Sequence, residues 1–491
     1  MSVKDAPNGK KTVSVKDVEV LSFDPVLEKR LLRKLDWVLL PLFTVTFILN
    51  FIDRCVVPRA AKEQRIGIEK DLGLVGYEYN IALTIFYICY ILFEIPSNLA
   101  LKRFGSVWLA FIVTAFGVIT IGSAFTHNFA GLVITRVFLG AAEGGTLPGL
   151  TYILSRYYRR SELVLRVGVV LGLAPTFAGA FGGLLASGLL SIPDIGSVTS
   201  WRKIFLVEGI ITSGFGLVCF LVIPDDPQRS RLLSAEQKVL AMARIADDQV
   251  VSTGGRTERT SLRLVLRAFN FNTTLCAVCF LMLNISFQGL SLFMPTVVAT
   301  QAYFLTATVE SQLRTVPPYV VGAAWVVLNT SYSSLIKRHG FPIFISVLLM
   351  VAGYAIFVGT HNSHARYAAC FLAIAGGSPT IPMFVAWGTD NAAPDTVRAV
   401  TTAIIPGIGA LGSIIAVWTY LPTDAPDYHM GNSLNLATSS AVCVLTLVGV
   451  LYIKWENHKR DRGGRDYRLD GLTNDELEQL GSLHPGYRYL E

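Results

Sequence analysis

A long apolar segment in the first third of the chain reads Arg136-Val137-Phe138-Leu139-Gly140-Ala141-Ala142-Glu143-Gly144-Gly145-Thr146-Leu147-Pro148-Gly149. In a helix, Arg136, Leu139, Gly140 and Glu143 share one face, and the two charged residues lie about two turns apart, roughly 10 Å. Gly140 and Gly144 have the spacing that lets two membrane helices approach closely. Ionisable groups at membrane depth are costly and face a partner or a wet cavity. We therefore expect this helix to line a pathway rather than to face lipid.

The composition outside this segment is that of a membrane protein. The 491 residues are 52% hydrophobic and 16% charged, against a usual charged share of about 25%. About 20 mostly apolar residues suffice to cross a bilayer as a helix. The stretches that meet this length are approximately 37–53, 80–101, 107–126, 131–154, 167–191, 204–224, 271–296, 315–336, 341–360, 366–388, 399–421 and 434–454. We predict an all-α membrane protein with twelve transmembrane helices.

A repeated basic turn divides these twelve segments into two sets of six. Leu101-Lys102-Arg103-Phe104-Gly105 follows the second span, and Ile336-Lys337-Arg338-His339-Gly340 follows the eighth, 235 positions later. Such an interval predicts two pseudo-symmetric halves that arose by parallel duplication. The predicted divisions are a tail at 1–36, a first half at 37–224, a linker at 225–267, a second half at 268–454 and a tail at 455–491. Within the linker, Ser234-Ala235-Glu236-Gln237 predicts a capping box that begins a short helix.

The basic residues indicate the orientation. With both tails in the cytosol, 32 of the 42 Lys and Arg residues fall on the inner side, as the positive-inside rule favours. We expect a plasma-membrane protein that contacts the lipid bilayer. Lys102, Arg103, Lys337 and Arg338 are interpreted as topology signals and partners in inner-gate ion pairs. Because the positive charge is spread along the ends of loops, no nucleic-acid partner is expected.

Several classes of function lack their motifs. No Gly-x-x-x-x-Gly-Lys loop is present, so ATP-driven pumping has no nucleotide site. We see no nucleophile–base set and no metal-ligand spacing, and we expect neither an enzyme nor a cofactor or metal. Cys276 and Cys279 form a single Cys-x-x-Cys motif, and the sequence has no second such motif to complete a zinc site. We interpret both cysteines as thiols that pack in the core.

A set of ordered motifs carries a family resemblance. They are Phe51-Ile52-Asp53-Arg54, Glu69-Lys70-Asp71-Leu72-Gly73, Phe93-Glu94-Ile95-Pro96-Ser97-Asn98, Lys102-Arg103-Phe104-Gly105, Arg136-x-x-Leu139-Gly140-x-x-Glu143-Gly144, Trp201-Arg202-Lys203-Ile204-Phe205-Leu206-Val207-Glu208-Gly209, Val316-Pro317-Pro318-Tyr319 and Asp424-Ala425-Pro426. Together they resemble the major facilitator superfamily and, within it, the fungal allantoate permease family of anion:cation symporters. The resemblance implies proton-coupled movement of a small organic anion, such as a vitamin, ureide or amino-acid derivative, by alternating access.

The resemblance also implies roles for charged residues of the first half. Glu143, Asp53 and Glu94 are the candidates for proton coupling, and Arg136 and Arg54 are the candidates for contact with an anionic substrate. For Glu143 the alternative is permanent pairing with Arg136. Glu94 precedes Pro96 near a helix end, so a gating or packing role is an alternative there. We expect Glu208 to pair with Arg202 and Lys203.

The second half offers amides and aromatic rings in place of charges. Asn284, Gln288, Tyr319, Asn329 and Trp387 are candidates for the cavity wall. Packing and interhelical hydrogen bonds are the alternative role for each of them.

Two departures from the family pattern leave other functions open. The eleventh span reads Gly409-Ala410-Leu411-Gly412-Ser413 where the family carries Gly-Asn-x-Gly-Gly, and Asp390-Asn391 stands where it commonly has Asn-Asn. We infer a substrate that differs from the family's familiar nutrients. Export of a secondary metabolite or toxin is the first alternative function, and a ligand sensor that does not transport is the second. We expect a monomer.

Overall fold

The computed structural model describes residues 25–59, 68, 71–190, 198, 200–228, 230–253, 262–301, 313–424, 427–469, 471 and 480–491. All of its regular elements are helical. They are α1 (Pro25–Arg59), α3 (Glu78–Phe104), α4 (Ser106–Ser123), α5 (Phe129–Glu143), α6 (Thr146–Tyr157), α7 (Arg160–Leu190), α8 (Ser200–Val222), α9 (Ala235–Thr253), α10 (Leu262–Arg267), α11 (Phe271–Gln301), α13 (Val316–Ile336), α14 (Gly340–Gly359), α15 (Ser363–Asp390), α16 (Asp395–Ala416), α17 (His429–Asp461) and the 3₁₀ turns η2 (Pro422–Asp424), η3 (Asp466–Leu469) and η4 (Gly481–Leu483).

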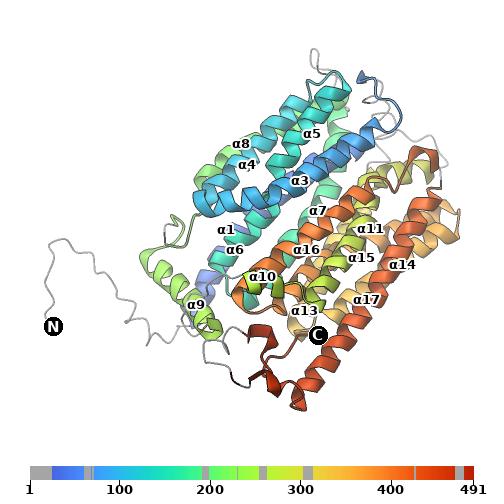
Figure 1. Cartoon of the computed structure of the whole chain (residues 1–491). Helices are drawn as coiled ribbons and strands as arrows, with labels where there is room; N and C mark the ends of the chain where they lie inside the picture. Colours follow the sequence, from blue (N-terminus) through green and yellow to red (C-terminus); the bar gives the residue numbers. More distant parts are fainter. Residues whose placement is uncertain are drawn as a thin grey trace, which may run out of the picture.

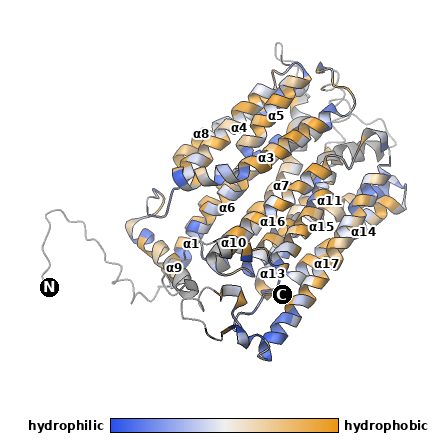
Figure 2. Ribbon diagram, in the orientation of Figure 1, coloured by the Kyte–Doolittle hydropathy of each residue, from blue (hydrophilic) through white to orange (hydrophobic). Residues whose placement is uncertain are grey.

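These helices confirm the predicted fold class. Among the described residues, nine helices are long and apolar enough to cross a membrane by length and composition. Three further spans complete the twelve: α3, the α5–α6 pair and α16. Figures 1 and 2 show the long helices running side by side, with polar residues gathered toward their ends.

The two halves repeat one pattern of helix pairing. In the first half, α1 packs against α7, α3 against α5, and α4 against α8. In the second half, α11 packs against α16, α13 against α15, and α14 against α17. These are the first and fifth, second and fourth, and third and sixth spans of each half. Contacts of α7 with α13, α3 with α16 and α1 with α11 join the halves.

The fourth span differs from the single helix expected over 131–154, because it is two helices that meet at Gly144 and Gly145. Glycine is a poor helix former, and Pro148 has no N–H to donate to the carbonyl of Gly144 one turn earlier. The break therefore follows from the sequence directly after Glu143.

The close helix approach predicted from Gly140 and Gly144 is confirmed. A Cβ at Gly140 would overlap the carbonyl oxygen of Phe86, and one at Gly144 would overlap that of Tyr90. Both partners belong to α3. These glycines therefore let α5, and the turn that follows it, pack directly against the backbone of α3.

The ends of α1 and α7 meet at the end of the molecule that also carries α9 and the C-terminus, which we call the tail end (Figure 1). The buried Arg244 of α9 binds Glu28 of α1 at 2.7 Å and Glu162 of α7 at 2.5 Å. The predicted capping box is confirmed at the start of α9, where Ser234 and Gln237 each accept a hydrogen bond from the other's backbone N–H.

The last residues of the chain bind the tail end of the second half. Asn391 exchanges two hydrogen bonds with the backbone of Leu490, at 2.9 and 2.7 Å. Asn457 of α17 exchanges two with the backbone of Tyr489, at 2.9 and 3.0 Å. The backbone N–H of His339 donates to the carbonyl of Glu491. The segment thus ties together the ends of α14, α15 and α17.

Replacement of Gly140 by alanine tests the contact between α3 and α5. The added Cβ must displace the backbone at Phe86, so Gly140→Ala should lower the free energy of unfolding by about 1–3 kcal/mol. Thermal unfolding in detergent measures the loss. Gly214→Ala on α8 is the matched control, since its Cβ meets open space. Equal stability of the two variants would contradict the close contact.

Replacement of Asn391 by alanine tests the C-terminal segment. The loss of two hydrogen bonds to Leu490 should cost about 1–3 kcal/mol and expose residues 480–491 to proteolysis. Unfolding temperature and the rate of proteolysis measure these effects. Ser334→Ala, at an exposed position of α13, is the control. Unchanged proteolysis in Asn391→Ala would show that this anchor is dispensable.

Candidate functional site

A group of buried ionisable side chains lies inside the first half. Asp53 of α1, Arg136 and Glu143 of α5, and Glu208 of α8 are each at most 2% exposed and interact electrostatically with one another. We call these four residues the acid cluster. The hydroxyl of Thr120 on α4 lies beside Asp53, and the guanidinium of Arg136 lies 5.7 Å from the ring centroid of Phe205.

The local sequence explains why α5 contributes two members. Leu132, Arg136, Leu139, Gly140 and Glu143 form the buried face of this helix, which contains the stripe expected from the sequence. The stripe faces the interior of the first half, however, and neither Arg136 nor Glu143 is among the residues that line the cavity between the halves.

The cluster holds more acids than bases. Among the described side chains, the cluster has three carboxyl groups, all of which interact electrostatically with its one guanidinium, that of Arg136. Even with Lys203, which is buried five residues before Glu208 on α8, the acids outnumber the cations. Uncompensated buried charge costs several kcal/mol per ion, so a carboxyl group in this position lowers that cost by taking up a proton.

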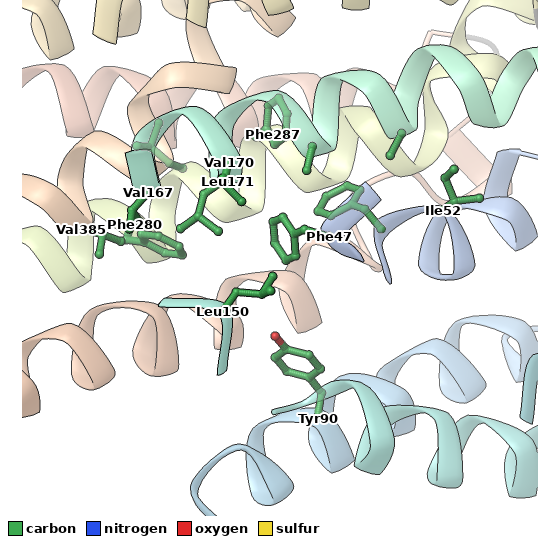
Figure 3. Packing of buried hydrophobic residues seen from close by; sticks show 14 of the residues in the cluster. Phe47, Ile52, Tyr90, Leu150, Val167, Val170, Leu171, Phe280, Phe287 and Val385 are labelled. Atoms are coloured by element: carbon green, nitrogen blue, oxygen red, sulfur yellow. The ribbon is translucent and has the colours of Figure 1, made fainter. Parts of the chain in front are cut away.

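A separate cavity of about 80 Å³ lies between the two halves. Helices of both halves supply its wall, and most of the side chains are apolar or aromatic. The lining residues are Phe47, Phe51, Tyr87, Tyr90, Glu94, Leu147, Leu171, Pro175, Phe280, Asn284, Phe287, Gln288, Ile381, Val385, Pro406, Ala410 and Ser413. Figure 3 shows Phe47 of α1, Tyr90 of α3, Leu171 of α7, and Phe280 and Phe287 of α11. We call this space the central cavity.

Two of its lining residues are prolines inside helices. Pro175 of α7 and Pro406 of α16 cannot donate to the carbonyls of Leu171 and Thr402, one turn earlier. Such positions loosen or bend a helix. The loosened turns of α7 and α16 face the cavity from opposite halves.

The polar groups of the cavity come mainly from α11. Asn284 and Gln288 are one turn apart on this helix, each less than a tenth exposed. The Asn284 amide donates to the carbonyl of Gly409 at 2.8 Å and to the hydroxyl of Ser413 at 3.1 Å. The carboxyl group of Glu94 on α3 belongs to the opposite half of the wall.

The predicted site residues therefore separate into groups. Asp53, Arg136 and Glu143 belong to the acid cluster, whereas Glu94, Asn284 and Gln288 line the central cavity. The remaining candidates of the second half lie elsewhere. The hydroxyl of Tyr319 is hydrogen-bonded to that of Ser291 at 2.9 Å, and its ring fills the space that a Cβ of Gly179 would occupy. Trp387 donates a hydrogen bond to the carbonyl of Leu490 at 3.0 Å. Asn329 donates one to the carbonyl of Pro342 at 3.2 Å.

The basic residues assigned to gating lie at the tail end. Arg103 borders a polar hollow beside Asp225 and Asp226, and Arg338 lies 3.7 Å from the carboxylate of Glu491. Lys337 is exposed directly after α13. The side chains of Arg54 and Lys102 are outside the described part of the structure.

Glu208 was expected to pair with Arg202 and Lys203, and the structure contradicts the first of these pairings. Arg202, its expected partner, instead binds Asp71 at 2.7 Å and the carbonyl of Thr126 at 3.1 Å. Glu208 interacts with Asp53 and Arg136. Its position eight residues into an apolar helix is the same signal that singled out Glu143, and it could have identified this third acid.

The acid cluster and the central cavity are mechanically connected. Gly144, directly after Glu143, packs against the backbone of Tyr90 and Glu94, and both of these residues line the cavity. A shift of α5 at Gly144 would therefore displace the backbone of Tyr90 and Glu94 in the cavity wall.

Comparison with known proteins places the chain among transporters. Residues 27–417 match the sequence profile of the Major Facilitator Superfamily. An uncharacterised transporter of Schizosaccharomyces pombe is 30% identical over 96% of this chain and 92% of its own length. The high-affinity nicotinic acid transporter of Saccharomyces cerevisiae is 29% identical over 94% of this chain and 85% of its own length. The proton:xylose symporter XylE shares the fold, with a TM-score of 0.63 and 16% identity over 85% of this chain and 94% of that chain.

Removal of the guanidinium tests the electrostatics of the acid cluster. Arg136→Met leaves three buried carboxyl groups around an apolar side chain, which should cost about 3–5 kcal/mol of stability and reduce the folded yield. Adding Glu208→Gln should restore part of the yield, because one acid fewer needs neutralising. Size-exclusion profiles and unfolding temperatures measure both variants.

The exposed Arg338→Met serves as the control and should change stability by no more than about 0.5 kcal/mol. If the second substitution lowers the stability of Arg136→Met further, Glu208 does not share the electrostatic balance of the cluster.

Proposed function

This chain belongs to the Major Facilitator Superfamily and is a multi-pass membrane transporter, and we propose that it is a proton-coupled symporter of a small organic anion. The observation that carries the proposal is the excess of carboxyl groups over cations among the described side chains of the acid cluster. A buried site with more acids than bases takes up and releases protons as its environment changes.

The connection between α3 and α5 supports coupling of that proton to the substrate. Glu143 precedes the break at Gly144, and Gly144 presses on the backbone of Tyr90 and Glu94 in the cavity wall. Protonation of Glu143 or Asp53 weakens the attraction to Arg136 and frees α5 to shift. The wall of the central cavity then changes with the charge state of the cluster.

The cavity supports an aromatic acid as the substrate class. Its phenylalanine and tyrosine rings form a wall suited to a small flat molecule. One relative that aligns with 94% of this chain is a nicotinic acid transporter. We propose that this chain carries a substrate of similar size and charge. Arg54, next to Asp53, remains our predicted contact for the carboxylate group.

The contacts between the halves support alternating access. At the end of the molecule opposite the tail end, Asn80 donates to the carbonyl of Val417 at 2.9 Å and Trp418 donates to the hydroxyl of Thr84 at 3.1 Å. With both tails in the cytosol of a plasma-membrane protein, these bonds close the outer side. Their rupture would accompany opening toward the outside.

Glu143→Gln tests the coupling. One pH unit equals about 1.4 kcal/mol, so a symporter that moves one proton per anion can accumulate about tenfold per unit of pH gradient. The variant should accumulate no more than the external concentration and still exchange labelled for unlabelled substrate. Uptake and counterflow in proteoliposomes measure the two activities.

Glu236→Gln on the exposed surface of α9 is the matched control and should retain full accumulation. Full accumulation by Glu143→Gln would remove this residue from proton coupling. Net outward movement of solute by the wild type would identify an exporter instead, and absence of any turnover would identify a sensor.

A further inference from the structure

We propose that a groove between α13, α14 and α17 binds an anionic phospholipid. Its phosphate group lies between Arg338 and Lys454, and an acyl chain follows the apolar side chains of α14 and α17. We call this space the lateral groove. The inference depends on the membrane location of the chain, and not on proton coupling or on the identity of the substrate.

The lateral groove has a volume of about 700 Å³, and its described lining belongs to the second half and the C-terminal segment. Leu447, Val450 and Lys454 share one face of α17, because they are three and four positions apart. Phe341 and Phe344 of α14 are also three positions apart and line the same space. Toward the tail end, α17 becomes hydrophilic (Figure 2). The wall is therefore apolar along most of its length and ends in a cation.

The sequence explains why the groove forms here. A Cβ at Gly340 would overlap the side chain of Val450, so this glycine lets α14 begin directly against α17. On its other side, α14 has little contact with α13, which packs mainly against α7 and α15. The first turns of α14 therefore form the floor of a groove whose walls are α13 and α17.

Two cations at the tail end of the groove face one carboxylate. The guanidinium of Arg338 lies 3.7 Å from a carboxylate oxygen of Glu491, and the ammonium of Lys454 lies 3.8 Å from the same oxygen. Both distances exceed a normal hydrogen bond, and the two side chains are 61% and 54% exposed, so each ion pair is weak. The three groups together keep one positive charge. Because one oxygen atom lies near both cations, a single phosphate group can contact both of them.

Aromatic residues indicate that these cations lie at the depth of the lipid headgroups. Trp455, next to Lys454, is exposed, and so is Tyr332 in the groove wall. Tryptophan and tyrosine concentrate where the hydrocarbon core meets the headgroups. Basic pockets beside transmembrane helices bind anionic headgroups at this depth. A phospholipid fills both parts of the groove, whereas a soluble anion leaves its apolar wall uncovered.

Matched probes separate the headgroup from the acyl chains. Phosphatidylglycerol carries a net negative charge, whereas phosphatidylcholine with the same dioleoyl chains carries none, and glycerol phosphate has the phosphate without the chains. Native mass spectrometry of the purified full-length protein in detergent measures the dissociation constant of the first bound molecule of each. Phosphatidylglycerol should bind about fivefold or more tightly than phosphatidylcholine, and glycerol phosphate should not bind up to about 1 mM.

Removal of a charge tests the two cations. Arg338→Gln and Lys454→Gln should each weaken the binding of phosphatidylglycerol about fivefold, because one cation near a headgroup contributes that much. Arg462→Gln removes the same charge from an exposed position directly after α17 and should leave the dissociation constant unchanged. If one of the two groove variants does not fold, the other provides the same test.

Two further variants test the carboxylate and the apolar wall. Glu491→Gln removes the competing carboxylate and should tighten the binding of phosphatidylglycerol several-fold, whereas Glu236→Gln on α9 should not. Leu447→Ser removes part of the apolar wall and should weaken the binding of both lipids. Leu335→Ser, at an exposed position of α13 that does not line the groove, is its control.

Equal binding of the two lipids, or equal effects of the Arg338, Lys454 and Arg462 substitutions, overturns the inference. Binding of glycerol phosphate that is lost in the same two groove variants would identify a site for a soluble phosphate, which also overturns it. The measurement uses no pH gradient and no transported substrate. Failure of the proposed symport therefore leaves its outcome unchanged.

Discussion

The interaction of Arg136 with three buried carboxyl groups organises the first half of the protein. Asp53, Glu143 and Glu208 come from α1, α5 and α8, so a single guanidinium interacts with acids on three helices. The membrane interior offers no water to solvate such charges, and the helices must supply partners for one another. This requirement favours packing of the three helices with their charged residues facing one another. The same arrangement places the break in the fourth span beside the wall of the central cavity, because the break follows Glu143 directly.

The two halves divide the polar chemistry between them. The first half buries ionisable groups in the middle of its helices, whereas the buried ion pair of Glu456 and Arg460 in the second half lies at the end of α17. The middle of the second half, as far as it is described, uses hydroxyls and amides, as in the bonds of Tyr420 with Asn432 and Asn435. Neutral groups exchange hydrogen bonds without taking up protons, so the second half keeps its interactions while the charge of the first half changes. Asn284 and Gln288 belong to this neutral region.

The sequence was sufficient for features that depend on spacing along one helix. The buried stripe of α5, the close approach at Gly140 and Gly144, and the capping box at Ser234 all follow from local periodicity and residue type. It was insufficient for features that depend on the facing helix. Trp387 is a residue type typical of a cavity wall, yet its ring N–H donates to the carbonyl of Leu490, more than 100 positions later. Glu208 interacts with Asp53, whereas Arg202, six positions before it, binds Asp71. No spacing within one helix shows which distant segment covers it.

The contacts at the tail end differ from those at the opposite end in which helices they join. Arg244 ties α9 to α1 and α7 of the first half, and residues 487–491 tie the ends of α14, α15 and α17 of the second half. Both sets of contacts at the tail end thus join helices of the same half. The hydrogen bonds of Asn80 and Trp418, by contrast, join one half to the other at the opposite end. Breaking these two bonds exposes neutral polar groups to solvent, whereas pulling Arg244 away from Glu28 and Glu162 would leave buried charge without partners. These hydrogen bonds between the halves are therefore less costly to break than the ion pairs of Arg244.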